Sequence, residues 1–550
     1  MNSIPSFLTS IFYHNSNFYK KFLHLMLLIF AAGISVFAFA PFYHFTALII
    51  SLSGIIFYIE AKNFKLKYYY MYFSVFYIVQ LYWMFYSLHT IIKLNILIAV
   101  VCFSLMILYL VIYMHFMLFL YNKLKFIDKD HKKPYARIYN LLILLPSIWV
   151  LIEYLRGILF TGFPWCNLAY SVVSNRFFNG LFPLFGSYAV SFLIVSFIAY
   201  IVLCCTYITE YFIHKKLQLS LRVFKILSII SIIYIIIFMI LAYYLYHKQY
   251  TKISSHPTTV ALVQGNISLE SKWHSQEYLS IYTNMLTQIP KNSSDIIVLP
   301  ETAIASFEEN LPNNYLDNLA NMAIMLGANL VTGIPKFLTN NNNNTMYDNT
   351  TYVNTAMLLT DKNHPYYAKV HLVPYGEYIP LKFILKPFYK FINLPMVGFS
   401  GGGINQKLIQ IKDQLIAFNI CYENLFNSEL RLFAKNASLM INLSEMIWYG
   451  NTIAKDQHLA ISRARALENQ RYWLQVTNTG MTAIISPFGT IQSSLAPFKR
   501  DILFGNVYGS RGNTLFQKTS NIPILTVSLL FIICTIIIKY YFKKEVKRLC

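Results

Sequence analysis

The run Ile-Ala-Phe-Asn-Ile-Cys-Tyr-Glu-Asn, residues 416–424, ends an apolar strand directly at a cysteine and a polar turn. Two other apolar runs end in a similar way. Ile-Ile-Val-Leu-Pro-Glu brings up Glu301, and Tyr-Tyr-Ala-Lys-Val-His-Leu-Val-Pro-Tyr-Gly-Glu carries Lys369 and Glu377. A thiol, a carboxylate and an ammonium group delivered by separate strands predict a nucleophile with its base and its charge partner.

The thiol of Cys421 would need activation, because a cysteine attacks well only as the thiolate. The helical pattern of residues 423–435 places Cys421 at the start of a helix, where the macrodipole favours negative charge. We expect Glu301 to accept the thiol proton and later to deprotonate the incoming nucleophile. Cys421 is also the only cysteine between residues 248 and 520, which indicates a free thiol.

Lys369 is expected to stabilise the negative oxygen of a tetrahedral intermediate, together with backbone N–H groups around Cys421 and Tyr422. Glu377 and Glu423 are candidates to orient Lys369 or to relay protons. Each residue alone has an ordinary explanation, either a buried core cysteine or a surface ion pair. The matched positions at strand ends favour a catalytic site over these explanations.

The two ends of the chain are rich in apolar segments. The chain is 56% hydrophobic and only 12% charged, and a bilayer span needs about 20 apolar residues. Segments of this kind lie at 22–40, 44–60, 68–88, 94–120, 139–157, 180–207, 224–246 and 522–540. The sequence therefore predicts an α-helical transmembrane bundle of about eight spans, with a soluble segment inserted between spans seven and eight.

The net charge of +22 indicates membrane topology rather than a nucleic-acid partner. Lysines and arginines gather in alternate loops and at the end of the chain, as in 62–67, 123–137, 215–225 and 539–548. The positive-inside rule then puts both termini in the cytoplasm. With seven spans before it, the 247–521 segment is expected on the outer side of the membrane.

The soluble segment alternates short Val- and Ile-rich runs with helical patterns, which predicts an α/β domain with buried strands. Predicted strands are 259–264, 295–300, 328–334, 353–359, 366–371, 415–421, 437–443, 472–477 and 482–486. Predicted helices are 275–289, 313–327, 424–435 and 453–470. The chain thus divides into a membrane domain (1–247), a catalytic domain (248–520) and a final span with a basic tail (521–550).

Three motifs carry a family resemblance. Leu-Pro-Glu-Thr-Ala (299–303), Lys-Val-His-Leu-Val-Pro-Tyr-Gly-Glu-Tyr-Ile-Pro (369–380) and Cys-Tyr-Glu (421–423) resemble the Glu-Lys-Cys signature of the nitrilase superfamily. Within it, the chain is similar to the bacterial apolipoprotein N-acyltransferase family. That similarity extends to the runs at 37–42, 153–156, 162–165, 263–267, 272–273, 463–468 and 477–480.

The resemblance implies an α-β-β-α sandwich mounted on the membrane bundle, with Glu301, Lys369 and Cys421 as the catalytic triad. It implies that Cys421 takes a fatty acyl chain from a glycerophospholipid as a thioester. The acyl chain then passes to the free α-amino group of the N-terminal S-diacylglyceryl cysteine of an apolipoprotein, the last step of bacterial lipoprotein maturation. A monomer in the inner membrane is expected, with its catalytic domain on the periplasmic side and with no metal or organic cofactor.

Four aromatic residues are candidate lipid or substrate contacts: Trp165, Trp273, Trp448 and Phe399. The apolar segment 391–403 is expected to form a lid whose hinge is the run of three glycines at its end. A loop packed on the core is the alternative.

The sequence departs from the family after the nucleophile's neighbouring strand. Residues 444–449 read Ser-Glu-Met-Ile-Trp-Tyr, where the family usually has an Asn-Asp-Ala-Trp-Phe-like run. No catalytic role is therefore assigned to Glu445. His458 has two interpretations, a residue that faces the site and a packing or capping residue, and the second is favoured because no metal-ligand spacing accompanies it. Glu153 and Arg156 are expected to form a structural ion pair one helical turn apart.

Two other functions are compatible with parts of the sequence. A membrane-tethered amidase acting on a small amide or nitrile would hydrolyse the thioester in an open, water-filled pocket. A transport or sensor protein would only bind a ligand through its outer domain, and replacing Cys421 by alanine would leave its function intact. The scarcity of ionisable residues inside the spans speaks against a simple transporter.

Overall fold

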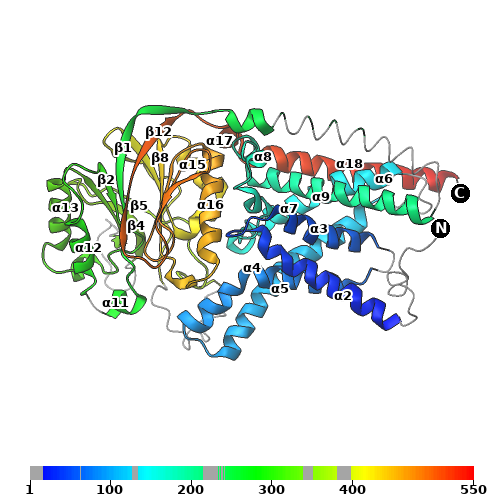
Figure 1. The fold of residues 1–550 in the computed structure, drawn as a ribbon, viewed down its shortest axis with the longest axis horizontal. Helices are drawn as coiled ribbons and strands as arrows, with labels where there is room; N and C mark the ends of the chain where they lie inside the picture. The colour runs from blue at the N-terminus through cyan, green and yellow to red at the C-terminus, as the bar shows by residue number, and fades with distance from the viewer. Residues whose placement is uncertain are drawn as a thin grey trace, which may run out of the picture.

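The computed structural model describes residues 17–61, 64–126, 134–214, 242–274, 276–338, 351–380 and 398–549, together with 229, 233, 236 and 240. Figure 1 shows a mixed α/β part beside a bundle of long helices. Helix α16 (Ala454–Asn469) lies between the two parts. The asparagine-rich tract at 340–344 and most of the predicted span at 224–246 lie outside the described residues.

The α/β part is the expected α-β-β-α sandwich. Its first sheet has the order β12-β1-β2-β3-β4-β5, and its second has the order β11-β10-β9-β8-β7-β6. The first sheet contains β1 (Lys252–Gln264), β2 (Ile296–Val298), β3 (Asn329–Leu338), β4 (Thr351–Leu358), β5 (Tyr366–Ala368) and β12 (Asp501–Arg511). The second contains β6 (Ile409–Ile411), β7 (Gln414–Ile420), β8 (Leu439–Ser444), β9 (Trp473–Thr477), β10 (Ala483–Ile485) and β11 (Ile491–Ser494).

Helices cover the outer face of each sheet (Figure 1). The first sheet carries α12 (Leu279–Leu286) and α13 (Tyr315–Met325), with the short α11 (Leu269–His274) at one end. The second carries α15 (Asn427–Ala434) and α16, and the short α17 (Leu515–Thr519) leads toward the bundle. The predicted helix 275–289 is thus confined to α12 within the described residues.

The two-residue period of the strands sorts their side chains into two cores. On β1, Val260 and Leu262 face the second sheet, whereas Ala261 and Val263 pack with α12 and α13. The strands β1, β2 and β3 run parallel, as do β7, β8 and β9. Parallel pairing brings the ends of neighbouring strands to one edge of each sheet, and the candidate site lies at those ends.

The bundle contains α2 (Asn17–Gly33), α3 (Phe45–Glu60), α4 (Leu66–Tyr86), α5 (Ile96–Leu124), α6 (Pro134–Tyr139), α7 (Leu145–Arg156), α8 (Arg176–Asn179), α9 (Phe182–His214) and α18 (Ile522–Leu549). Four described segments are long and apolar enough to cross a membrane: 96–124, 135–156, 182–209 and 522–541. Two shorter apolar helices cover 22–38 and 45–60. The protein is therefore an integral membrane protein, and the count of about eight spans stays a prediction.

The predicted pair on α7 is present and buried. The Arg156 guanidinium lies 3.9 Å from the Glu153 carboxylate. Arg156 also donates to Asn167 Oδ1 at 2.6 Å, and Glu153 accepts a hydrogen bond from the Leu168 backbone N–H at 2.9 Å. Both contacts fasten the loop after α7 to the helix, which agrees with a structural pair.

Helix α16 joins the two parts of the molecule through both of its faces. Leu459 and Ala466 pack with the second sheet and α15, whereas Ala460 and Ile461 pack in the core of the bundle. Gln457 Oε1 accepts hydrogen bonds from the indole N–H groups of Trp83 (3.1 Å) and Trp165 (2.7 Å). The same helix therefore supports the second sheet and fixes its position on the membrane helices.

Candidate active site

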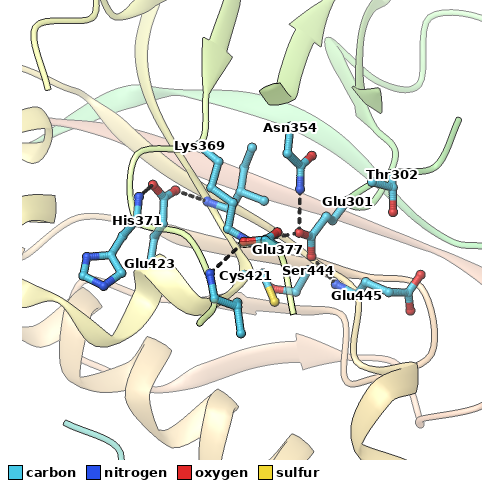
Figure 2. Close-up of polar contacts among 12 residues, drawn as sticks. Glu301, Thr302, Asn354, Lys369, His371, Glu377, Cys421, Glu423, Ser444 and Glu445 are labelled. Carbon is cyan, nitrogen blue, oxygen red and sulfur yellow. Dashed lines mark hydrogen bonds and ion pairs between the residues drawn. The ribbon is translucent and has the colours of Figure 1, made fainter. Parts of the chain in front are cut away.

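Cys421 begins a short 3₁₀ helix, η7 (Cys421–Leu425), directly after β7. Its backbone has φ +53°, a left-handed conformation that costs energy in a non-glycine residue and persists only where the surroundings hold it. The side chain is 6% exposed. The abrupt change from strand to helical turn points the thiol out of the sheet, toward the other residues drawn in Figure 2.

Glu301 follows β2 and is almost fully buried. One carboxylate oxygen, Oε1, accepts hydrogen bonds from Asn354 Nδ2 at 2.9 Å and from Lys369 Nζ at 3.2 Å. The other, Oε2, accepts one from the Glu445 backbone N–H at 2.7 Å (Figure 2). Fixed partners on both oxygens hold the carboxylate in a single orientation.

Lys369 follows β5 and bridges two carboxylates. Its ammonium group lies 3.2 Å from Glu301 Oε1 and 2.7 Å from Glu377 Oε1, and the side chain is 1% exposed. Burial by itself lowers the pKa of Lys369, but the two carboxylates together raise it well above its usual value. Lys369 is therefore protonated near neutral pH, and among the described residues only Glu301 and Glu377 accept hydrogen bonds from its ammonium group.

Glu377 and Glu423 fix the segment that carries Lys369 in different ways. Glu377 holds the ammonium directly, and its second oxygen accepts a bond from the Val373 backbone N–H at 2.8 Å. Glu423 Oε1 instead accepts bonds from the backbone N–H groups of Val370 (2.6 Å) and His371 (3.1 Å). Of the two predicted functions of this pair, direct orientation of Lys369 thus belongs to Glu377.

Glu423 also connects this segment to β7, the strand that ends at Cys421. Its Oε2 accepts a hydrogen bond from the Ile420 backbone N–H at 2.6 Å, and Tyr367 donates to its Oε1 at 2.9 Å. Burial raises the pKa of Glu423 to about 7, although these backbone N–H groups and the charge of Lys369 lower it. The carboxyl group can therefore gain or lose a proton near neutral pH.

The expected activation of Cys421 by a helix dipole is wrong. The predicted helix 424–435 is divided into η7 and α15, so Cys421 starts a five-residue 3₁₀ helix and not an α-helix. Burial raises the pKa of the Cys421 thiol well above its usual value, and the Glu301 charge adds to this rise while Lys369 offsets part of it. The Cys421 side chain is therefore a neutral thiol, and it would need a base to take its proton before it could act as a nucleophile.

His458, on α16, supports the strained turn at Cys421. Its Nε2 lies 3.4 Å from the Cys421 carbonyl oxygen. Burial lowers the pKa of His458 to about 4, so the ring is neutral at physiological pH and donates its Nε2 proton to that carbonyl. This arrangement agrees with a packing residue, as the sequence indicated.

The candidate substrate contacts lie in different surroundings. Trp165 is buried against Phe163 and Trp83 in the bundle. Phe399 is also buried, and its ring lies 4.8 Å from that of Tyr352. Trp448 is half-buried in a 3₁₀ turn after β8, and the side chain of Trp273 is outside the described residues. Tyr422 connects the site to the bundle, donating to the Gly162 carbonyl at 2.9 Å.

The glycine run expected to be a hinge packs closely on the strand of Lys369. Residues 391–397 are not described, but the Gly402 backbone N–H donates to the Lys369 carbonyl at 2.7 Å. A Cβ atom on Gly402 would lie 2.6 Å from the Ala368 carbonyl oxygen. Gly402 therefore permits a close approach of two backbones beside the site.

Two contacts of Glu301 were not predicted from the sequence. The Asn354 amide and the Glu445 backbone N–H come from β4 and from the residue after β8. Asn354 is a fully buried amide inside a predicted strand, and such a residue needs a hydrogen-bond partner, which is a signal that could have identified it. A backbone donor such as that of Glu445 leaves no trace in the residue types.

A sandwich with this buried thiol, carboxylate and ammonium at its strand ends defines the class of carbon–nitrogen hydrolases. The Carbon-nitrogen hydrolase family model matches residues 259–511, and the Apolipoprotein N-acyltransferase N-terminal domain model matches residues 31–200. The chain belongs to the apolipoprotein N-acyltransferase family and is an acyltransferase. The resemblance stated from its motifs is thereby confirmed.

Relatives align along most of the chain. The apolipoprotein N-acyltransferase of Neisseria meningitidis serogroup A is 34% identical over 91% of this chain and 93% of its own length. That of Wigglesworthia glossinidia brevipalpis is 30% identical over 93% of this chain and 97% of its own. Among solved structures, a mutant of the Nesterenkonia AN1 amidase from the nitrilase superfamily covers 48% of this chain and 93% of its own at 14% identity, with a TM-score of 0.33. The family assignment rests on the named acyltransferases and the two family models.

Proposed function

We propose that this enzyme transfers a fatty acyl chain from a glycerophospholipid to the α-amino group of the N-terminal S-diacylglyceryl cysteine of apolipoproteins. The observation that carries the proposal is the buried Cys421, Glu301 and Lys369 beside a direct contact with the bundle. That contact is the hydrogen bond from Tyr422, the residue after the nucleophile, to the Gly162 carbonyl. Both substrates have acyl chains anchored in the bilayer, so the thiol must lie near the membrane.

In the first half-reaction, the Cys421 thiol attacks an ester carbonyl of the phospholipid while Glu301 takes its proton. The carbonyl oxygen becomes an oxyanion, which Lys369 and nearby backbone N–H groups stabilise. Collapse of this intermediate breaks the ester bond, and the proton on Glu301 passes to the departing lysophospholipid oxygen. The acyl chain remains on Cys421 as a thioester.

In the second half-reaction, the amino group of the apolipoprotein attacks the thioester carbonyl. Glu301 takes a proton from the amine, and Lys369 again stabilises the oxyanion. The C–S bond then breaks, the proton returns to the Cys421 sulfur, and an amide forms. Burial of all three groups supports transfer rather than hydrolysis, because it keeps bulk water from the thioester.

We also propose the orientation expected from the charge pattern. The catalytic domain lies on the periplasmic side of a bacterial inner membrane, with both termini in the cytoplasm, and the enzyme works as a monomer. The distribution of basic residues among the loops supports this orientation.

The test combines the detergent-purified enzyme with a phospholipid labelled in its acyl chains and a synthetic S-diacylglyceryl-cysteinyl peptide. We expect labelled N-acyl peptide and lysophospholipid in equal amounts, and no product from the Cys421→Ser variant. Free labelled fatty acid in place of the acylated peptide would contradict the proposal and support the amidase alternative.

A further inference from the structure

Two buried charged residues contact Glu301 and take no part in either half-reaction. The Lys272 ammonium, on α11, forms an ion pair with the Glu445 carboxylate, at the end of β8. Both residues are 3% exposed. Removing two charges from water is costly, and their attraction compensates only when further hydrogen bonds satisfy them. Because a buried ion pair is costly, its presence beside the proposed base indicates that the pair contributes to the function of that base.

Further bonds satisfy the carboxylate of this pair. Asn478 Nδ2 donates to both Glu445 oxygens, at 3.2 and 3.0 Å, and the Ile447 backbone N–H donates to Oε1 at 3.2 Å. Asn478 is itself held by the Ile267 backbone through its amide oxygen (3.0 Å) and nitrogen (2.8 Å). The side chain of Glu445 is thus held by Lys272, by Asn478 and by the backbone of its own turn.

The pair contacts both the side-chain carboxylate and the backbone carbonyl of Glu301. The Glu445 backbone N–H donates to Glu301 Oε2 at 2.7 Å, and Lys272 Nζ lies 3.4 Å from the Glu301 carbonyl oxygen. Lys272, Glu445 and Glu301 therefore form a closed ring of contacts between α11, β8 and β2. Movement of either partner would shift the carboxylate of the base.

The turn that carries Glu301 needs such support. Thr302 has φ +44°, a strained conformation for a β-branched residue. Lys272 Nζ lies 3.5 Å from its hydroxyl. On the other side, a Cβ atom on Gly333 would lie 2.4 Å from the Pro300 carbonyl, so only glycine lets β3 approach the turn this closely.

We propose that Lys272 and Glu445 are a positioning pair that holds the Glu301 carboxylate in line for proton transfer with Cys421. This inference rests on the proposed function, in which Glu301 acts as base in both half-reactions. It assigns a function to Glu445 in the segment where this chain departs from the Asn-Asp-Ala-Trp-Phe-like run of its family. The side chains of Lys272 and Glu445 pair with each other, and only the backbone N–H of Glu445 reaches the carboxylate of the base.

The experiment is a double-mutant cycle in the full-length enzyme, with single-turnover acylation of Cys421 by a defined phospholipid as the rate. We expect Lys272→Met and Glu445→Gln each to slow acylation by about tenfold or more. This loss is a part of the roughly 10²–10⁴-fold rate enhancement that a general base contributes. The apparent KM for the phospholipid should not change. The double variant should be no slower than the slower single variant, because the second change removes a charge already left without its partner.

Three outcomes would overturn the inference. They are multiplicative losses in the double variant, a change confined to KM, and a lower thermal midpoint with an unchanged rate per folded enzyme. The control pair is Lys499 and Asp501, which are exposed and lie 2.6 Å apart; Lys499→Met and Asp501→Asn should leave the rate unchanged. If the wild-type enzyme forms no acyl-enzyme, the proposed function itself fails; if it does and the variants match it, only this inference fails.

Discussion

At the scale of single residues, the proposed nucleophile of the site is uncharged, and the charges belong to the residues around it. The thiol of Cys421 is neutral at rest, because burial and the Glu301 charge raise its pKa. The cation beside it, Lys369, is held by two carboxylates and cannot lose its proton near neutral pH. Reaction therefore depends on how accurately Glu301 and Lys369 are oriented, and the residues that orient them should matter for rate.

Glu377 gives the first prediction at this scale. Replacing Glu377 by glutamine removes the charge 2.7 Å from Lys369 Nζ, so the ammonium is free to turn toward Glu301. We expect thioester formation to slow by about tenfold, less than the loss of an oxyanion donor itself. The control is Glu429→Gln, since Glu429 pairs with His371 at the partly exposed edge of the site. Equal rates in the two variants would contradict this account of Glu377.

Glu423 gives a prediction about pH. Its folded-state pKa of about 7 means that it gains a proton as the pH falls through that value. A protonated oxygen can no longer accept all the backbone N–H bonds that hold Val370 and His371, so the strand end carrying Lys369 loosens. The rate of Cys421 acylation should therefore fall below about pH 7, and His458, with a pKa of about 4, cannot cause that fall.

The matching variant is Glu423→Gln, whose side chain does not titrate. Its acylation rate should be low and should lack the fall near pH 7, as measured from about pH 8 to about pH 5.5. A wild-type rate that stays constant across this range would contradict the assignment.

The sequence indicated which residues lie together in the site, but it did not indicate the protonation state of the thiol. Glu301, Lys369 and Cys421 could be predicted because each ends an apolar run, a pattern that residue types record. The raised pKa of the thiol could not, because it depends on burial at the contact between domain and bundle. The contacts of Lys272 with Glu445 and of Glu445 with Glu301 also join segments far apart in the chain, and no local pattern encodes them.

At the scale of elements, α16 connects the catalytic sheet to the bundle. Replacing Gln457 by leucine would leave the buried indole N–H groups of Trp83 and Trp165 without their shared acceptor. Each unsatisfied group costs about 1–3 kcal/mol, so the apparent thermal midpoint in detergent should fall clearly. Gln492→Leu, on the exposed β11, is the control, and an equal midpoint in both variants would contradict this function of α16.

The elements themselves were predictable where the residues form a continuous apolar run, as in β7 and β8. The prediction omitted β6, β11 and β12. The first two are short, and β11 is mostly exposed. In β12, Gly505 and Gly509 lower the strand propensity, yet a Cβ at either position would lie within 2.4 Å of a side chain of the second sheet. Those glycines are therefore required by the packing of the sandwich.

At the scale of the whole molecule, the proposed orientation predicts which surfaces meet the periplasm. Asn318 is exposed on α13, in the catalytic domain, and Lys67 is exposed at the start of α4. In intact spheroplasts, a membrane-impermeant maleimide should label Asn318→Cys and should label Lys67→Cys only after lysis. The unsubstituted enzyme corrects for its own cysteines. Labelling of Lys67→Cys before lysis, with Asn318→Cys protected, would contradict the proposed orientation and indicate the opposite one.

The central claim is that Cys421 carries the acyl chain, and intact-protein mass spectrometry tests it most directly. The purified enzyme is incubated with one defined diacyl phospholipid, with Cys421→Ser as the control. We predict a mass increase of one acyl chain that maps to Cys421, is released by neutral hydroxylamine and is absent from the control. A folded wild-type enzyme that gains no such mass, or gains it equally in Cys421→Ser, would contradict the account.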